Sequence, residues 1–326
     1  MLAAGVAAAL AGCENATPVS APLMPGGSPS RLSKYPLKRG ASPSSVATEA
    51  INRAPAGVFQ PPTGLVQVPV PEGSITMLPG HGNYVALTVD DGTDAEVLAA
   101  YIALAKRTGL RLTFFANGYM SSWTDHARAL RPLVDSGQAV ICNHTWSHRE
   151  LTTLSDHEIV REVQHNEQFL TNTYGTNGRP FLRPPYGSHN RHVDRILQAL
   201  GYPAVTMWWG SLADSTPEPP GQIVANAEKW FLPQRIVIGH ANHPGVLSVM
   251  DRIVDIINQR NLQPVHLADI YDLSRLPPMP TPSPSQSATP SPTATATPTG
   301  TPSATPTPAH KPSGSPSPSA HPTKAH

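Results

Sequence analysis

The sequence of 326 residues predicts an α/β fold in which strand–helix units repeat around a parallel sheet. Between Tyr84 and Ile270, short apolar runs alternate with longer segments whose apolar residues recur three and four positions apart. Several of these longer segments end at glycine, which commonly terminates helices. Seven strands are expected, one fewer than a closed eightfold barrel contains.

The expected strands are short and apolar, as strands that are buried on both faces are. They comprise residues 84–89, 111–116, 139–142, 181–183, 204–208, 235–238 and 264–267. The expected helices lie between these strands and carry apolar residues at helical spacing. They comprise residues 95–107, 126–136, 156–174, 191–200, 222–230 and 246–260.

The composition changes along the chain and indicates the domain boundaries. Residues 277–326 are almost entirely Pro, Thr, Ser and Ala, and residues 14–77 are also rich in Pro, Ser, Ala and Gly. Such stretches cannot bury enough apolar surface to offset the entropy lost on ordering, so we expect a disordered tail and a linker. Within the linker, residues 64–70 could add an edge strand. The folded domain is expected to span residues 78–276.

The first residues have the character of an export signal. Residues 1–10 are apolar and rich in small side chains, and residues 10–13 resemble the lipobox of bacterial lipoproteins. We therefore expect residues 1–13 to be a signal ending at Cys13, whose lipidation would hold the exported protein at the outer face of the membrane; secretion is the other expected fate. The first basic residue is Arg31, however, so either the true start lies upstream or the segment is not a signal.

Net charge and cysteine content narrow the range of partners. The formal net charge of +1 gives no reason to expect nucleic acid as a partner, and we expect a monomer. The two cysteines, Cys13 and Cys142, lie in different parts of the chain and are not expected to pair. Cys142 could be a metal ligand, but its apolar surroundings favour a buried thiol.

Polar side chains follow six successive expected strands. These residues are Asp90 and Asp91, Asn117, His144, Arg183, Asp214 and His240. Because the carboxyl ends of parallel strands meet at one edge of the sheet, we expect these side chains to converge there. The sequence therefore predicts one functional site, built from most of the strands.

Two histidines and two acids within this set favour a metal site. His144 and His148 are four residues apart, a spacing that on a helical turn places both rings on one face. Two solvent-exposed histidines at a helix start would give the same pattern. Of the adjacent acids, one carboxylate could bind a metal ion while the other accepts a proton. Alternatively, the acidic segment up to Asp94 caps the next helix.

Several segments together resemble the NodB-type polysaccharide deacetylases, carbohydrate esterase family 4. The resemblance covers about 190 residues and rests on residues 86–92, 144–148, 183–187, 208–214 and 236–240, with 113–118 in addition. The segments follow in the order of the family's motifs, although 208–214 matches weakly. The resemblance implies a distorted (β/α) barrel that lacks one strand, in agreement with the seven strands expected from the apolar pattern.

The resemblance also implies the roles of the residues in the first three motifs. Asp91, His144 and His148 would bind a divalent ion, with zinc favoured over cobalt or nickel. Asp90 would be the base that takes a proton from the attacking water. Arg183 would hold Asp90 in place, since a guanidinium can pair bidentately with a carboxylate.

The remaining roles fall on weaker matches to the family's motifs. His240 would be the acid that protonates the leaving amine, and Asp214 would orient its ring and raise its pKa. Asp214 could equally be a solvated loop acid, and His243 is a rival to His240. The backbone N–H of Tyr186 could help to stabilise the oxyanion.

Several residues near the motifs are expected to contact the substrate. Trp208, Trp209, Tyr186 and Asn117 lie at the same strand ends as the catalytic residues. The tryptophans, and Trp146 with them, could stack on sugar rings or could belong to the core.

The function that the resemblance implies is metal-dependent removal of acetyl groups from an N-acetylated or O-acetylated polysaccharide. Peptidoglycan or another N-acetylglucosamine polymer is the expected substrate. Some positions depart from the family's pattern, namely Val89, Ser211, Ser215 and residues 239–243. A glycan-binding module that has kept the fold but lost turnover is therefore the alternative.

Overall fold

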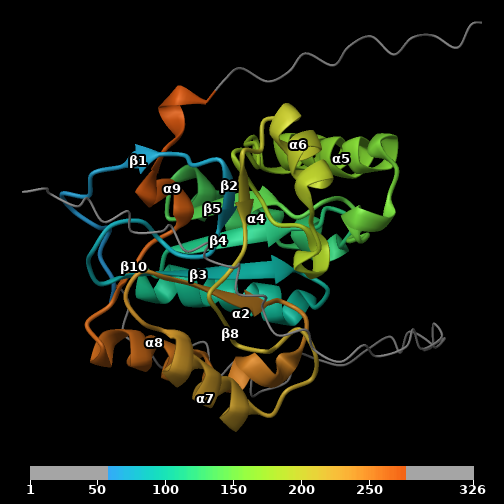
Figure 1. Ribbon diagram of the computed structural model, residues 1–326. Coiled ribbons are helices and arrows are strands. Elements are labelled where there is room, and N and C mark those ends of the chain that lie inside the picture. Colours follow the sequence, from blue (N-terminus) through green and yellow to red (C-terminus); the bar gives the residue numbers. More distant parts are fainter. Residues whose placement is uncertain (1–57, 277–326) are drawn as a thin grey trace, which may run out of the picture. The chain divides into compact units, whose positions relative to one another are not determined.

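The computed structural model describes residues 58–276 (Figure 1). The predicted signal with Cys13, the linker up to residue 57 and the tail from residue 277 lie outside the described residues. In the part that is described, no helix combines the length and apolar character needed to cross a bilayer.

A parallel sheet of nine strands forms the centre of the domain. Its strands follow the order β2-β7-β6-β5-β4-β3-β9-β8, with β10 paired to β3. The strands are β2 (Gly73–Ile75), β3 (Tyr84–Asp91), β4 (Leu112–Ala116), β5 (Ala139–Asn143), β6 (Phe181–Leu182), β7 (Ala204–Thr206), β8 (Gly210–Ser211), β9 (Arg235–His240) and β10 (Gln263–Pro264). The sheet curls into an incomplete barrel, so the predicted fold class is confirmed.

Helices follow most of the strands, as the sequence predicts. The α-helices are α2 (Ala95–Thr108), α3 (Ser121–Asp125), α4 (Ala127–Asp135), α5 (Asp156–Tyr174), α6 (Arg191–Ala199), α7 (Pro220–Trp230), α8 (Met250–Gln259) and α9 (Leu267–Ile270). Short 3-10 helices are η1 (Leu151–Thr153), η2 (Pro185–Gly187), η3 (Pro244–Val249) and η4 (Leu273–Arg275). In Figure 1, α7 and α8 lie below β3, whereas α5 and α6 lie at the other end of the sheet.

Two stretches differ from the elements predicted for them. The helix expected over 246–260 is divided into η3 and α8. The strand expected over 264–267 stops after Pro264, because the His266 side chain accepts a hydrogen bond from the Asp269 N–H and caps the short helix α9 instead.

The fold extends N-terminally beyond the boundary expected at residue 78. Strand β1 (Val68–Pro69), within the predicted edge strand, pairs with β11 (Tyr271–Asp272), and β2 pairs with β7. Ile75 and Phe59 are buried among core side chains. The many prolines of this region led to the prediction of a linker, although it contains these few buried apolar residues. Part of the expected linker therefore belongs to the folded unit.

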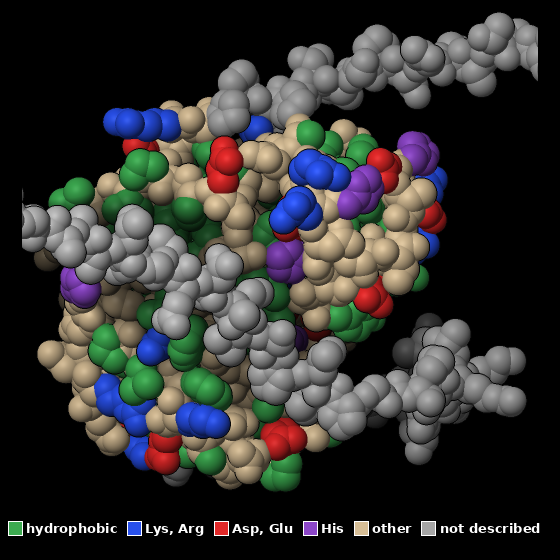
Figure 2. Space-filling model, in the orientation of Figure 1, with side chains coloured by type: hydrophobic (Ala, Val, Ile, Leu, Met, Phe, Trp, Pro, Cys, Tyr) green, Lys and Arg blue, Asp and Glu red, His purple; other side chains and the backbone are tan. Residues whose placement is uncertain are grey.

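Side chains alternate along β3 and divide the core in two. Val85, Leu87 and Val89 pack with the helices α2, α4, α7 and α8, whereas Ala86 packs inside the curl of the sheet. Because strand side chains alternate, Asp90 points to the same face as Ala86. This alternation directs a carboxylate into the barrel. On the outside, the face seen in Figure 2 carries acidic and basic side chains interspersed.

Candidate active site

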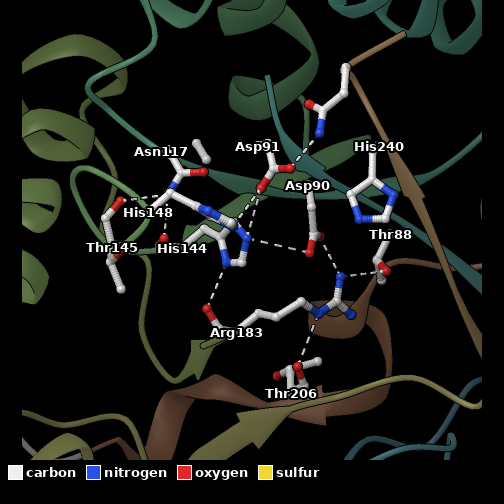
Figure 3. A network of polar contacts seen from close by, with 12 residues as sticks. Thr88, Asp90, Asp91, Asn117, His144, Thr145, His148, Arg183, Thr206 and His240 are labelled. Atoms are coloured by element: carbon white, nitrogen blue, oxygen red, sulfur yellow. Dashed lines mark hydrogen bonds and ion pairs between the residues drawn. The ribbon is translucent and has the colours of Figure 1, made fainter. Parts of the chain in front are cut away.

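Asp91, His144 and His148 meet at the carboxyl end of the sheet (Figure 3). Asp91 Oδ1 lies 3.0 Å from Nε2 of His144 and 3.2 Å from Nε2 of His148. One possible ligand atom from each of the three residues lies within 4.8 Å of the others. All three side chains are buried or partly buried. The three residues that the sequence predicts as metal ligands are therefore brought together.

The donor atoms of this triad suit a cation. His144 Nδ1 lies 2.6 Å from the carbonyl oxygen of Arg183, so that nitrogen carries the proton and the Nε2 lone pair faces Asp91. Asp91 Oδ1 is buried, and neither imidazole contact gives it a hydrogen bond of good geometry. Lone pairs that face each other in a buried site repel unless a proton or a metal ion lies between them.

Electrostatics also favour positive charge at this position. Burial raises the pKa of Asp91, but contacts with His144 and His148 outweigh burial and hold that pKa far below its usual range. Burial lowers the pKa of His144, yet the negative charges of Asp90 and Asp91 outweigh burial and raise it overall. The site therefore attracts a cation, whether a proton or a divalent ion.

The loop that carries both histidines is not helical, in contrast to the helical turn that their spacing suggested. Thr145 and His148 have positive φ angles of 67° and 59°, and Asp91, at the end of β3, has a φ of 65°. Such angles are strained in residues other than glycine and persist where the surroundings enforce them. Because the loop turns sharply, both imidazoles point toward the same atom, Asp91 Oδ1.

Buried asparagines hold this loop. The Asn117 amide donates to the carbonyl oxygens of His144 and Thr145, and the Asn143 Oδ1 accepts from the Thr145 N–H at 2.8 Å. Asn166, on α5, donates to Asn143 Oδ1. Asn117 is fully buried, so its side chain supports the loop and does not make the substrate contact that we expected.

Asp90 lies beside the triad and pairs with Arg183, as the sequence predicts. The Arg183 Nη1 donates to Asp90 Oδ1 and to Thr88 Oγ1, and both members of the pair are buried. A bidentate pair was expected, but only Nη1 of Arg183 donates to Asp90. The other guanidinium N–H groups donate to the carbonyl oxygens of Thr206 at 3.0 Å and Met207 at 3.1 Å. This arrangement fixes one Asp90 oxygen and leaves Oδ2 3.6 Å from His144 Nε2.

His240 lies opposite Asp90 on the neighbouring strand and is held by Asp214. The two strands pair Asp90 with His240 directly, and Figure 3 shows the ring beside the carboxylate. His240 Nδ1 lies 3.0 Å from Asp214 Oδ1, and its backbone N–H donates to Asp214 Oδ2. Asp214 is almost fully buried, which does not fit a solvated loop acid. His243 lies beyond the strand, directly before η3.

A family model described as polysaccharide deacetylase matches residues 78–205. The match includes Asp90, the triad and Arg183. The chain contains a polysaccharide deacetylase domain, residues 78–205. Asp214 and His240 lie beyond the matched residues, and it is their geometry that links them to this site.

Two curated relatives are similar to this chain over part of their own length. A chitin deacetylase of Pestalotiopsis is 34% identical over 137 residues, which are 42% of this chain and 45% of the relative. A peptidoglycan-N-acetylglucosamine deacetylase of Listeria monocytogenes is 24% identical over 187 residues, 57% of this chain and 38% of the relative. The chain thus spans less than half the length of either relative.

A solved structure shares the fold of the deacetylase domain. It is a pseudoenzyme of carbohydrate esterase family 4 from Bacillus anthracis. The TM-score is 0.55 and the identity 20%, and the match covers 62% of this chain and 70% of that chain. Because a pseudoenzyme has the same fold, the fold alone does not show turnover.

The aromatic residues that were expected to contact the substrate have different surroundings. The Tyr186 ring is exposed and its centroid lies 4.6 Å from that of His148. Trp208 is partly buried, 5.6 Å from the Arg183 guanidinium carbon. Trp209 does not reach the site. Its backbone N–H donates to the carbonyl of Ile236, four residues before His240, which is roughly 13 Å at the usual rise of a strand.

Cys142 is a free, buried thiol and is not among the three converging ligand atoms. Burial raises the pKa of this thiol above its ordinary value, which disfavours the thiolate that binds metals. It is therefore a core residue.

Asn242 is a site residue that sequence reasoning missed. Its Nδ2 donates to Asp91 Oδ2, and its Oδ1 accepts from the Thr93 N–H at 3.4 Å. A carboxylate oxygen can only accept, which fixes the orientation of the amide. With Oδ2 occupied in this way, Asp91 presents Oδ1 alone to the histidines. The only signal in the sequence was its place two residues after His240.

We expect Asn242→Ala to weaken metal binding by the deacetylase domain about 10-fold to 100-fold, since partners of metal ligands commonly have effects of this size. Zinc affinity can be measured by competition with a chromogenic chelator. Asn258→Ala, at an exposed position on α8, is the matched control and should bind zinc as the unmodified chain does. Equal affinities for the two variants would show that Asn242 does not position Asp91.

Proposed function

We propose that this domain hydrolyses acetyl groups from an N-acetylated polysaccharide and that it needs a divalent metal ion, with zinc favoured, to do so. One observation carries the proposal. Asp90 and His240 face each other beside the Asp91–His144–His148 triad, and each has its own buried partner, Arg183 or Asp214. A base and an acid flanking a cation site can together carry out amide hydrolysis.

The side chains divide the reaction between them. A divalent ion in the triad would supply a Lewis acid for the acetyl carbonyl. Asp90 Oδ2 takes the proton of the attacking water, while Arg183 holds Asp90 Oδ1. His240 then gives its proton to the sugar nitrogen as the carbon–nitrogen bond breaks, which leaves acetate and a free amine. The Tyr186 peptide N–H would donate to the oxyanion.

The two relatives support an N-acetylglucosamine polymer as the substrate class. One is named for chitin and the other for peptidoglycan N-acetylglucosamine. Both polymers carry the same acetamido group, and its removal is the same hydrolysis. We therefore propose a β-linked N-acetylglucosamine chain, with peptidoglycan as the first candidate.

The test is acetate release from N-acetylglucosamine oligomers and from peptidoglycan by the full chain. We expect release to stop after chelation, to return with zinc, and to be absent in Asp91→Ala whether or not zinc is added. If zinc binds tightly but no acetylated glycan releases acetate, the chain is a glycan-binding module without turnover and the proposal is wrong.

A further inference from the structure

Exposed aromatic side chains are unevenly placed on this domain. Among the described residues, the exposed large hydrophobic side chains include three aromatic rings, Tyr186 at 71%, Tyr119 at 66% and Trp209 at 48%. Tyr186 lies against His148, and Tyr119 lies edge-on to Trp146 with 6.2 Å between ring centroids. Two of the three exposed rings therefore flank the loop of the proposed metal ligands. Exposed aromatic surface beside a catalytic site commonly marks ligand contact.

The position of Tyr119 is fixed by its neighbours. Its backbone N–H donates to the carbonyl of Trp146 at 3.1 Å. Trp146 is stacked on His165 of α5, with 3.8 Å between ring centroids and 19° between planes. A Cβ at Gly118 would lie 2.7 Å from the Trp146 ring and 2.6 Å from Phe169. This close packing fills the space behind Tyr119, so its ring stays at the surface.

An open groove of about 430 Å³ begins at Trp146 and runs along α5. Its lining includes Trp146, Arg149, Arg161, Glu158, His165 and Gln168. Arg149 directly follows the proposed metal ligand His148 in the chain, so the groove starts beside the loop of His144 to His148. The volume is within the usual range for small-ligand sites.

The charges of this groove balance. Arg149 pairs with Glu158 at 3.1 Å, and the lining also holds one further arginine and one further glutamate, Arg161 and Glu162. A lining without excess charge of one sign favours a neutral ligand rather than an anion or a cation. Planar guanidinium, carboxylate and amide groups can donate to or accept from hydroxyl and acetamido groups. An aromatic ring offers the apolar surface that the C–H face of a pyranose needs.

We propose that Tyr119, together with the groove beside Trp146, binds a sugar unit of the polysaccharide next to the unit that is deacetylated. This inference rests on the proposed function for the identity of the polymer. Trp146 belongs to the loop of His144 to His148, so this subsite adjoins the proposed metal ligands. Occupation of the subsite would favour chains over single sugars, because each further unit adds contact area.

The test compares a long substrate with one too small to reach the groove, using the full chain with zinc. For the N-acetylglucosamine pentamer, Tyr119→Ala should lower kcat/KM about tenfold, chiefly through KM, since stacking contacts contribute on this scale. Hydrolysis of a small aryl acetate should not change. Tyr119→Phe keeps the ring and should retain pentamer activity. Trp209→Ala, an exposed aromatic away from the site, should behave as the unmodified chain does.

Pentamer binding to the chelated chain, measured by equilibrium dialysis, separates this inference from the proposed function. If no variant releases acetate but Tyr119→Ala weakens pentamer binding, the proposed activity is wrong while the subsite stands. Equal loss for the pentamer and the aryl acetate, or no loss for either, would overturn the subsite. Binding of a peptide in place of the pentamer would overturn it as well.

Discussion

Replacing His240 with alanine is expected to lower kcat for acetate release about 10²-fold to 10⁴-fold, the usual contribution of a positioned general acid. His240 Nδ1 is hydrogen-bonded to Asp214, so Nε2 is the ring nitrogen that can donate a proton to the substrate. The ring is not one of the three converging ligands, and zinc affinity should therefore be unchanged. Rates and chelator competition on one preparation measure both quantities. A loss of zinc binding in His240→Ala would mean that the residue is a ligand and not the acid.

The pH profile tests the same assignment through Asp214. Burial lowers the pKa of His240, but the hydrogen bond to Asp214 and the charges of Asp90 and Asp91 outweigh it and raise the pKa overall. A general acid works only while it is protonated, so activity falls as the pH rises through this raised pKa. Asp214→Asn removes one of the raising charges, and the basic limb should move to lower pH. A basic limb that stays in place would exclude His240 as the titrating acid.

Much of the fold was predictable because the sheet is buried on both faces. Strands such as β3 and β4 consist mainly of buried apolar residues, and α5 begins and ends at the predicted residues, between a capping box at Ser155 and a left-handed Gly175. The short strands β6 and β7 were predicted too long, because only two or three residues of each find a neighbour with which to pair. Pairing partners are a tertiary property that apolar character does not report.

The candidate site was predictable where residue type decides the chemistry. The triad, Asp90, Arg183, His240 and Asp214 come together as the motifs indicated. The supporting contacts were not predictable, since an amide such as that of Asn242 or Asn166 reaches its partner only after distant segments meet. Trp209 was misplaced for a related reason. A residue that is adjacent to a motif in the sequence need not lie at the same end of the sheet as the motif.

We expect Arg183→Met to destabilise the domain strongly. Arg183 is fully buried, and its guanidinium donates to Asp90, Thr88 and two backbone carbonyls. Removing one member of a buried ion pair leaves the other charge uncompensated, which costs about 3–5 kcal/mol. The total free energy of unfolding of such domains is about 5–15 kcal/mol. The midpoint of urea unfolding should fall accordingly, with the slope unchanged.

The double variant Asp90→Asn with Arg183→Met separates the buried charge from the lost packing. If the uncompensated carboxylate causes the instability, neutralising Asp90 should restore part of the free energy of unfolding, because the isolated charge is gone. Activity should not return, since the proposed base is absent. If the double variant is no more stable than Arg183→Met, the lost hydrogen bonds to the carbonyls of Thr206 and Met207 account for the cost. Arg183 would then stabilise the barrel chiefly by joining β6 to β7, and its pairing with Asp90 would serve only the chemistry.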